Sequence, residues 1–210
     1  MSEISRNFVD PLPCPARTNA IPESTPVEHW KHLPPYKVQS EEQFGPIKWR
    51  GRCFCGNITY LLKREKPLNA KYCHCPVCRV THGAPLQWAA LFHKHDMSFT
   101  NGASGLAFYS STHRSQKHIL PTKVSCANCR TPIMDEGRNM CLIFPQLIQL
   151  EGSSQEQRKK REVFKPTCHI FYESRMLDLP DGLPKWSGMA NVSDRMDDHG
   201  NRIEVGKMIV

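Results

Sequence analysis

Cys73-His-Cys-Pro-Val-Cys78 places three cysteines within six residues, and this stretch decides how the rest of the chain is interpreted. Two smaller groups accompany it, Cys53-Phe-Cys55 upstream and Cys126-Ala-Asn-Cys129 downstream. Spacings this short let neighbouring thiolates converge on one metal ion, because a turn brings both sulfurs to the same side. A single C-x2-C pair would indicate little. Three clusters in one chain favour metal binding over chance or buried free thiols.

The seven clustered cysteines suit one site with four ligands and one with three. A closed structural zinc takes four protein ligands, whereas a catalytic zinc keeps three and leaves a position for water or substrate. Joining the two pairs would tie distant segments together, and the triplet can cover one face of an ion by itself. We therefore predict a structural zinc at Cys53, Cys55, Cys126 and Cys129, and an open, catalytic zinc at Cys73, Cys75 and Cys78. Spacing alone also permits a swapped grouping.

Three other cysteines and two histidines need separate interpretations. Cys14 lies in a proline-rich arm, and Cys141 follows the pattern of a buried core residue. Cys168 is ambiguous, because it or a histidine would close the second site if it supplied a fourth ligand. His74 and His82 lie near the triplet and are the candidates for catalytic roles, although histidines beside a metal loop are often structural or merely exposed.

Composition limits the class of protein. The chain has 210 residues, 39% of them hydrophobic, and carries a formal net charge of +8. It contains no apolar run long enough to span a bilayer, and Met1 to Asp10 has no apolar leader. We therefore expect a cytoplasmic, non-membrane protein whose ten cysteines serve metal binding rather than disulfides. The positive charge suits an anionic partner, either a small carboxylate-bearing substrate or nucleic acid, or it simply solvates loops.

The sequence divides into an extension, a domain and a tail. Prolines are frequent in residues 1–44, which predicts an irregular N-terminal extension. Residues 45–188 read as one mainly β domain, with a polar, basic loop at 152–162, and residues 189–210 read as a C-terminal tail. Short apolar segments predict the strands: two within 51–62 joined by a Gly-Asn turn, then 87–92, 97–100, 106–110, 140–150, 163–164 and 169–172.

The ordered clusters resemble those of a known family, the glutathione-dependent formaldehyde-activating enzymes, which share a domain with centromere protein V. The resemblance rests on Gly51-Arg-Cys-Phe-Cys-Gly56, on Tyr72-Cys-His-Cys-Pro-Val-Cys-Arg79 followed by Gly83-Ala-Pro85, and on Cys126-Ala-Asn-Cys-Arg-Thr-Pro132. Lys165-Pro-Thr-Cys-His-Ile170 and Asp181-Gly-Leu-Pro184 fit its closing segment. The similarity runs from about Ile47 to Trp186.

The resemblance implies a β-tent fold, with a structural zinc held by the two pairs and a catalytic zinc held by the triplet. It also implies carbon–sulfur lyase chemistry on a glutathione or other thiol adduct, with glutathione as a co-substrate. One departure is Arg130, which stands where the family usually has a glycine able to adopt a positive φ. The long arm, the basic insertion and the tail also differ from a minimal member of the family.

A rival interpretation is a non-catalytic zinc scaffold that binds nucleic acid or a protein partner. The net charge and the basic insertion favour it, but the chain lacks the aromatic-rich surface motif of many RNA-binding modules, so nucleic acid is the less favoured partner. The two interpretations differ at the triplet: a fourth protein ligand there would favour the scaffold. Nothing in the sequence indicates an oligomeric state.

Overall fold

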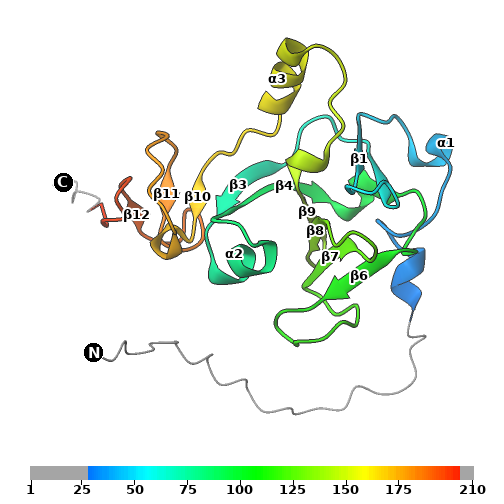
Figure 1. Cartoon of the computed structure of the whole chain (residues 1–210), viewed down its shortest axis with the longest axis horizontal. Helices are drawn as coiled ribbons and strands as arrows, with labels where there is room; N and C mark the ends of the chain where they lie inside the picture. The colour runs from blue at the N-terminus through cyan, green and yellow to red at the C-terminus, as the bar shows by residue number, and fades with distance from the viewer. Residues whose placement is uncertain (1–27, 204–210) are drawn as a thin grey trace, which may run out of the picture.

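The computed structural model describes residues 28–203, and it confirms a mainly β fold built from two sheets (Figure 1). The smaller sheet has the order β1-β2-β5 and the larger has the order β12-β11-β10-β3-β4-β9-β8-β7-β6. The strands are β1 (Trp49–Arg52), β2 (Thr59–Leu62), β3 (Asn69–Cys73), β4 (Gln87–His93), β5 (Met97–Phe99), β6 (Leu106–Tyr109), β7 (Thr122–Cys126), β8 (Pro132–Glu136), β9 (Met140–Ile143), β10 (His169–Ile170), β11 (Lys185–Trp186) and β12 (Arg195–Met196).

The smaller sheet begins with the predicted hairpin. β1 and β2 pair antiparallel, with Arg52 opposite Thr59, and Gly56 turns the chain between them at φ 82°. A glycine adopts this left-handed conformation at little steric cost, which explains its place in the turn. The hairpin turn carries Cys53 and Cys55, so the first cysteine pair lies at one end of this sheet.

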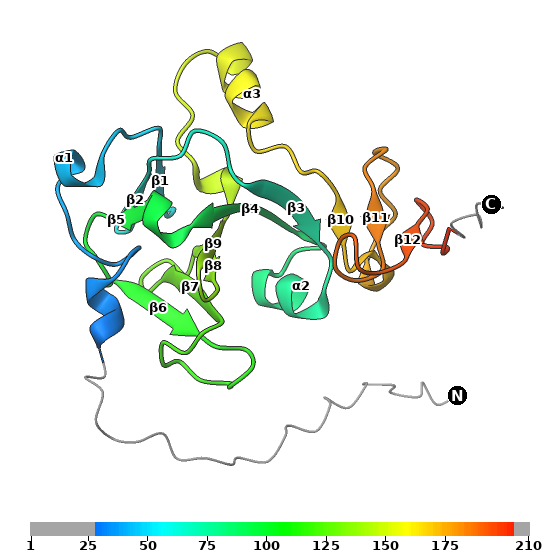
Figure 2. The same cartoon turned by 180° about the vertical axis from the view of Figure 1, so that it is seen from behind.

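The larger sheet brings segments distant in sequence next to the triplet. β3 ends at Cys73 and pairs antiparallel with β4, which places Gln87 opposite Cys73. On its other side β3 pairs in parallel with β10, so that Ile170 lies opposite Cys73. The chain therefore returns near its C-terminal end to flank the triplet, and Figure 2 shows β10, β11 and β12 beside the end of β3.

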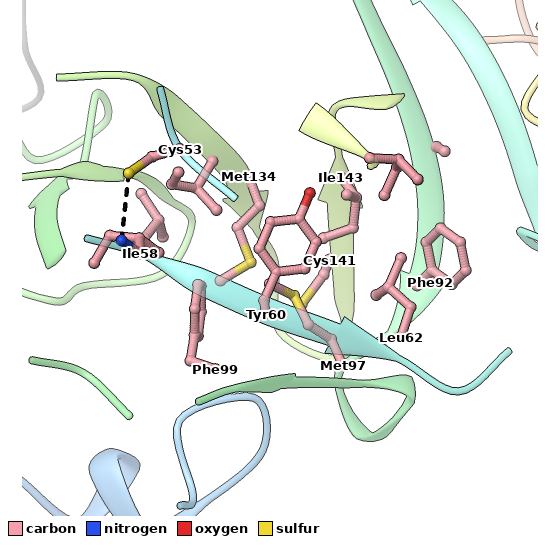
Figure 3. Packing of buried hydrophobic residues seen from close by; sticks show 14 of the residues in the cluster. Cys53, Ile58, Tyr60, Leu62, Phe92, Met97, Phe99, Met134, Cys141 and Ile143 are labelled. Carbon is pink, nitrogen blue, oxygen red and sulfur yellow. Dashed lines mark hydrogen bonds between the residues drawn. The ribbon is translucent and has the colours of Figure 1, made fainter. Parts of the chain in front are cut away.

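The hydrophobic core lies between the two sheets. β7 alternates buried and half-buried side chains, which is the pattern of a strand with one face on a core. Tyr60, Met134 and Ile143 from both sheets meet in this core, and Cys53 lies at its edge, where its sulfur accepts a hydrogen bond from the Ile58 amide (Figure 3). The first cysteine pair therefore directly adjoins the hydrophobic core.

Three α-helices and four short 3-10 helices complete the described part of the chain. The α-helices are α1 (Glu41–Phe44), α2 (Pro76–His82) and α3 (Ser154–Glu162), and the 3-10 helices span His29–His32, Lys94–Asp96, Pro145–Leu147 and Tyr172–Ser174. The sequence analysis missed α2, a helix too short to show a clear period. Among residues 28–203, the longest helix has nine residues, and none is long and apolar enough to cross a membrane.

The insertion at 152–162 is a helix rather than the predicted loop. Ser153 caps α3: its hydroxyl accepts a hydrogen bond from the Glu156 amide, and the Glu156 side chain accepts one from the Ser153 amide. This capping box favours a helix over a loop. The prediction of solvent exposure holds, because α3 has no buried residue and projects from the molecule in Figures 1 and 2. The predicted strand at 163–164 is also wrong, since these residues follow α3 without pairing, although Phe164 is buried.

Both flanking segments contain ordered structure that packs against the domain. In the arm, Tyr36 and Phe44 are buried, and Tyr36 belongs to the core. In the tail, β12 pairs with β11, and Met196 is buried. The described part of each segment therefore packs as part of the fold, and the division at residues 44 and 188 stays a prediction. Cys14 and the ends of both segments lie outside the described residues.

Candidate metal centres

Four cysteines from two hairpin turns converge at the first centre. Cys53 and Cys55 lie in the β1–β2 turn, Cys126 ends β7, and Cys129 lies in the turn before β8. Their sulfurs all lie within 4.8 Å of one another, with 3.5 Å between Cys53 and Cys55 and 3.8 Å between Cys55 and Cys126. The predicted pairing of distant segments is thus present in the structure, and it joins one sheet to the other.

Thr131 and Arg130 shape the second turn of this centre. The Thr131 hydroxyl lies 3.0 Å from the Cys129 sulfur and also accepts a hydrogen bond from the Phe54 amide of the first turn. Hydrogen bonding to Thr131 lowers the pKa of Cys129 to about 5. Arg130 has φ 60°, the left-handed conformation expected where the family has glycine. The turn keeps its shape although a non-glycine residue is disfavoured in that conformation.

The four sulfurs fit a tetrahedral metal ion. Zinc–sulfur bonds of about 2.3 Å in a tetrahedron place sulfurs about 3.8 Å apart, close to the observed spacings. Burial raises the pKa of Cys53 to about 11. A bound cation would offset this effect of burial, because it stabilises the thiolate and lets the Cys53 thiol lose its proton. This group could therefore hold a zinc ion with every protein ligand in place.

The triplet forms the second centre within the larger sheet. Cys73 ends β3, Cys75 is the N-cap of α2 and Cys78 lies in its first turn, where the Cys78 amide donates to the Cys75 sulfur at 3.4 Å. The three sulfurs lie within 4.8 Å of one another. Among residues 28–203, no histidine, carboxylate or further cysteine joins this group at that distance. The triplet group therefore has three sulfurs and, among the described residues, no fourth side-chain ligand beside them.

Electrostatics also favour a cation at the triplet. Hydrogen bonds from Cys73 and Cys78 lower the pKa of Cys75 to about 2, and the Lys123 ammonium acts in the same direction. The hydrogen bond to Cys75 raises the pKa of Cys73 to about 11, and hydrogen bonding to Cys73 raises that of Cys78. A divalent cation would stabilise all three thiolates.

His74 belongs to a buried hydrogen-bonded chain behind the triplet. Its Nε2 lies 2.9 Å from His169 Nδ1, and His169 Nε2 lies 2.9 Å from Asp181 Oδ2. Lys185 donates to Asp181 Oδ1 at 2.9 Å and also pairs with Asp198 at 2.7 Å. Because a carboxylate accepts only, His169 Nε2 donates to Asp181, His169 Nδ1 accepts from His74, and His74 Nδ1 carries the lone pair.

That chain explains the position of His74 better than a direct catalytic role does. Burial, followed by the field of His169, lowers the pKa of His74 to about 4. Its ring is buried, and its Nδ1 has no hydrogen-bond partner in the described part of the chain. The sequence pattern could have suggested two of the partners, since His169 and Asp181 lie in segments quoted for the family resemblance, and Lys185 directly follows the second segment.

His82 lies at the end of α2, close to a polar group that the sequence analysis missed. Its ring packs edge-on against Phe144 at 4.9 Å, and its Nε2 is buried without a partner among residues 28–203. Burial lowers the pKa of His82, while nearby Asp135 raises it. Asp135 in turn accepts hydrogen bonds from Gln87 and Lys123, at 2.8 Å each. Gln87 and Asp135 lie outside every cysteine cluster in the sequence, so no spacing pointed to them.

A cavity of about 160 Å³ separates α2 from the strands that carry this polar group. Val77 lines it from α2, while Lys123, Asp135 and Leu142 line it from β7, β8 and β9. Lys123 and Asp135 are opposite each other in the β7–β8 pair. The cavity is thus bounded by the helix that contributes Cys78 and by an ion pair from the facing strands.

Within residues 28–203, the cysteines outside the two centres form no disulfide. All nine cysteines of residues 28–203 are free thiols. Cys141 is buried in the core, as predicted. Cys168 is buried beside β10 and is not part of the triplet group. Neither therefore closes the open site in this structure.

The fold and the two clusters define a family of zinc-compatible β proteins. A family model described as "Glutathione-dependent formaldehyde-activating enzyme" matches residues 48–174, and the chain belongs to that family. A crystal structure of a Rhodobacter sphaeroides protein is similar at 20% identity with a TM-score of 0.39, covering 50% of this chain and 93% of that one. None of the curated proteins matches the chain.

Proposed function

We propose that this protein is a zinc-dependent enzyme that forms or cleaves a carbon–sulfur bond in a thiol adduct, with glutathione as the favoured thiol. The observation that carries the proposal is the three-sulfur group at Cys73, Cys75 and Cys78, which has no fourth protein ligand within the described residues. A centre with three ligands keeps a coordination position for substrate, whereas a scaffold has no need of one. Family membership supports the same class of reaction.

The two cysteine groups take different roles in this proposal. Cys53, Cys55, Cys126 and Cys129 hold a structural zinc, and Cys73, Cys75 and Cys78 hold the catalytic one. When bound at the triplet, zinc would lower the pKa of a substrate thiol and polarise an oxygen on the neighbouring carbon. Nine free thiols are compatible with a reducing compartment, for which the cytoplasm is our proposal.

The residues around the triplet supply charge and shape. The Lys123 ammonium offsets the excess negative charge of three thiolates. Val77 and Leu142 give the adjoining cavity apolar walls, which limit the water that can reach a small reacting group. The hydrogen bonds that link the His74 side chain through His169 to Asp181 hold the backbone between Cys73 and Cys75. These side chains therefore position the reaction and exclude solvent.

Metal analysis and exchange spectroscopy test the proposal together. We expect about two zinc ions per chain, of which mild chelation removes the triplet ion first, because three ligands hold a metal less tightly than four. NMR exchange spectroscopy on glutathione and formaldehyde should show exchange with the adduct that rises with enzyme concentration and disappears after chelation. A protein that holds both ions and leaves the exchange at its spontaneous rate would contradict the lyase function and favour the scaffold.

A further inference from the structure

Asp135 has one anchored and one free carboxylate oxygen. Its Oδ2 accepts hydrogen bonds from Gln87 Nε2 and from Lys123 Nζ, both at 2.8 Å. Its Oδ1 is shielded from solvent and has no hydrogen-bond partner among residues 28–203. Buried polar atoms are nearly always paired, so a lone acceptor calls for an explanation. Two donors on one oxygen fix the carboxylate and leave the other oxygen without a donor.

The position of this carboxylate ties it to the triplet. Gln87, which anchors it, lies directly opposite Cys73 in the β3–β4 pair. Lys123, the other anchor, lies opposite Asp135 in the β7–β8 pair. Asp135 and Lys123 also line the cavity that Val77 of α2 closes from the other side. Side chains from β4 and β7 therefore hold Asp135 in the wall of a cavity that α2 also lines, and Asp135 is not part of the triplet group.

The size of the cavity limits what can react there. Its volume of about 160 Å³ is well above the roughly 10–15 Å³ that a single water needs, so the cavity can hold a small polar group. A one-carbon hydroxyl or carbonyl group fits in that space, while the rest of a thiol such as glutathione would have to lie outside. Asp135 can accept a proton and cannot donate one while it is a carboxylate, so it suits a hydroxyl group of the substrate.

We propose that Asp135 is the proton acceptor for the hydroxyl group of the thiol adduct, with Gln87 and Lys123 as its positioning residues. This inference rests on the proposed function. In the cleavage direction, Asp135 takes the proton of the S–C–O–H group, and the electron pair of the O–H bond becomes the second bond of the carbonyl. The C–S bond breaks and its electron pair stays on sulfur. Asp135 then passes the proton to the thiolate, which leaves an aldehyde and a thiol with atoms and charge balanced.

The simpler alternative is an ion pair that only ties β7 to β8. Lys123 and Asp135 face each other across these strands, which is a common place for a structural pair. That alternative accounts for Oδ2 but not for the buried, unpartnered Oδ1. It also does not require Gln87, a buried side chain from a different strand, to anchor the same oxygen. The two explanations predict different results when the carboxylate is replaced.

Asp135→Asn is the central test, because asparagine keeps the shape but loses the basic oxygen. We expect kcat for adduct exchange to fall by at least about 100-fold, the usual contribution of a positioned acid or base, with zinc content unchanged. In Asp135→Ala, added formate should restore part of the rate, since a small carboxylate can occupy the vacated space. Asp178→Asn is the matched control, because Asp178 is an exposed partner of Arg175, and it should exchange at the parent rate.

Gln87→Met keeps the proposal testable if both Asp135 variants fail to fold. It removes one anchor of Oδ2, so kcat should fall about tenfold while KM stays the same. If the parent enzyme does not accelerate exchange at all, the proposed function fails and this inference fails with it. If the parent is active and Asp135→Asn is equally active, only the inference is overturned. Loss of the triplet zinc in Asp135→Asn, or no formate rescue, would also overturn it, because either result assigns Asp135 a structural role.

Discussion

Gly51 illustrates how a single residue couples the first cysteine pair to the core. A Cβ at this position would lie 2.1 Å from the ring of Tyr60, far inside van der Waals contact. Tyr60 is fully buried among the core residues and has no free space into which to move. Gly51 precedes Cys53 by two residues, so any displacement of β1 there would also move a proposed zinc ligand. The requirement for glycine is therefore one of space rather than of backbone conformation.

We expect Gly51→Ala to lower the free energy of unfolding by about 3 kcal/mol, at the upper end of the usual cost of overpacking. Urea unfolding of the zinc-loaded protein measures this loss. The matched control is Gly137→Ala, because a Cβ there would meet its nearest neighbour, the Met140 carbonyl oxygen, at an ordinary 3.6 Å. Equal unfolding midpoints for Gly51→Ala and the parent would show that the strand shifts freely, against this account of the packing.

At the scale of elements, local sequence predicted some parts of the fold well and others poorly. The β1–β2 hairpin was predictable, because a glycine turn joins two apolar segments that pair locally. β11 and β12 were not predicted, because each has only two residues and is a strand only through its pairing with a neighbouring strand. The same limit applies to the site. Cysteine spacing predicted both sulfur groups, but Asp135 and Gln87 come together only through strand register.

The helix α3 shows local structure without a contribution to the core. Its capping box and its run of good helix-forming residues stabilise it locally, while no residue of it is buried. The sequence Arg158-Lys-Lys-Arg161 is therefore a basic turn of helix that is open to solvent. Phe164, three residues later, is buried and must be retained in any deletion. The boundary between the dispensable and the essential part of this segment lies between α3 and Phe164.

We expect deletion of residues 153–161 to leave both metal centres and the melting temperature nearly unchanged. The segment buries almost no apolar surface, so its removal costs little of the hydrophobic stabilisation. Differential scanning calorimetry and zinc analysis on the deletion and the parent check the expectation. The control is a deletion extended through Phe164, which should melt several degrees lower, because a buried aromatic side chain is lost. A large drop for the shorter deletion would mean that α3 supports the core.

At the scale of the whole molecule, the two cysteine groups occupy different positions in the fold. The four-cysteine group joins a turn of the smaller sheet to a turn of the larger one, so a metal there would tie the two sheets together. The triplet lies entirely within the larger sheet and α2, where strand pairing already holds its ligands. Metal bound at the first centre would therefore contribute to global folding, whereas metal at the second would act locally.

We expect Cys129→Ala and Cys78→Ala to fail in different ways. Cys129→Ala removes a ligand from the centre that joins the sheets, so the variant should be poorly soluble or melt much lower. Cys78→Ala should release or weaken the triplet zinc and abolish adduct exchange, while its circular dichroism and melting stay near those of the parent. Zinc content, circular dichroism and melting are measured on both variants under the same metal supply. Because both changes replace one cysteine ligand with alanine, each variant is the control for the other.

Two results would contradict this division of roles. If Cys78→Ala unfolds while Cys129→Ala stays stable, the triplet is the structural centre and the roles are reversed. If both variants fold and retain the parent's zinc content, the sulfurs gathered within 4.8 Å of one another are not the ligands. The expected results, an unstable Cys129→Ala and a folded Cys78→Ala, arise only if Cys129 helps to join the two sheets and Cys78 acts within one sheet and α2. It therefore tests the arrangement of the two sheets together with the chemistry assigned to each centre.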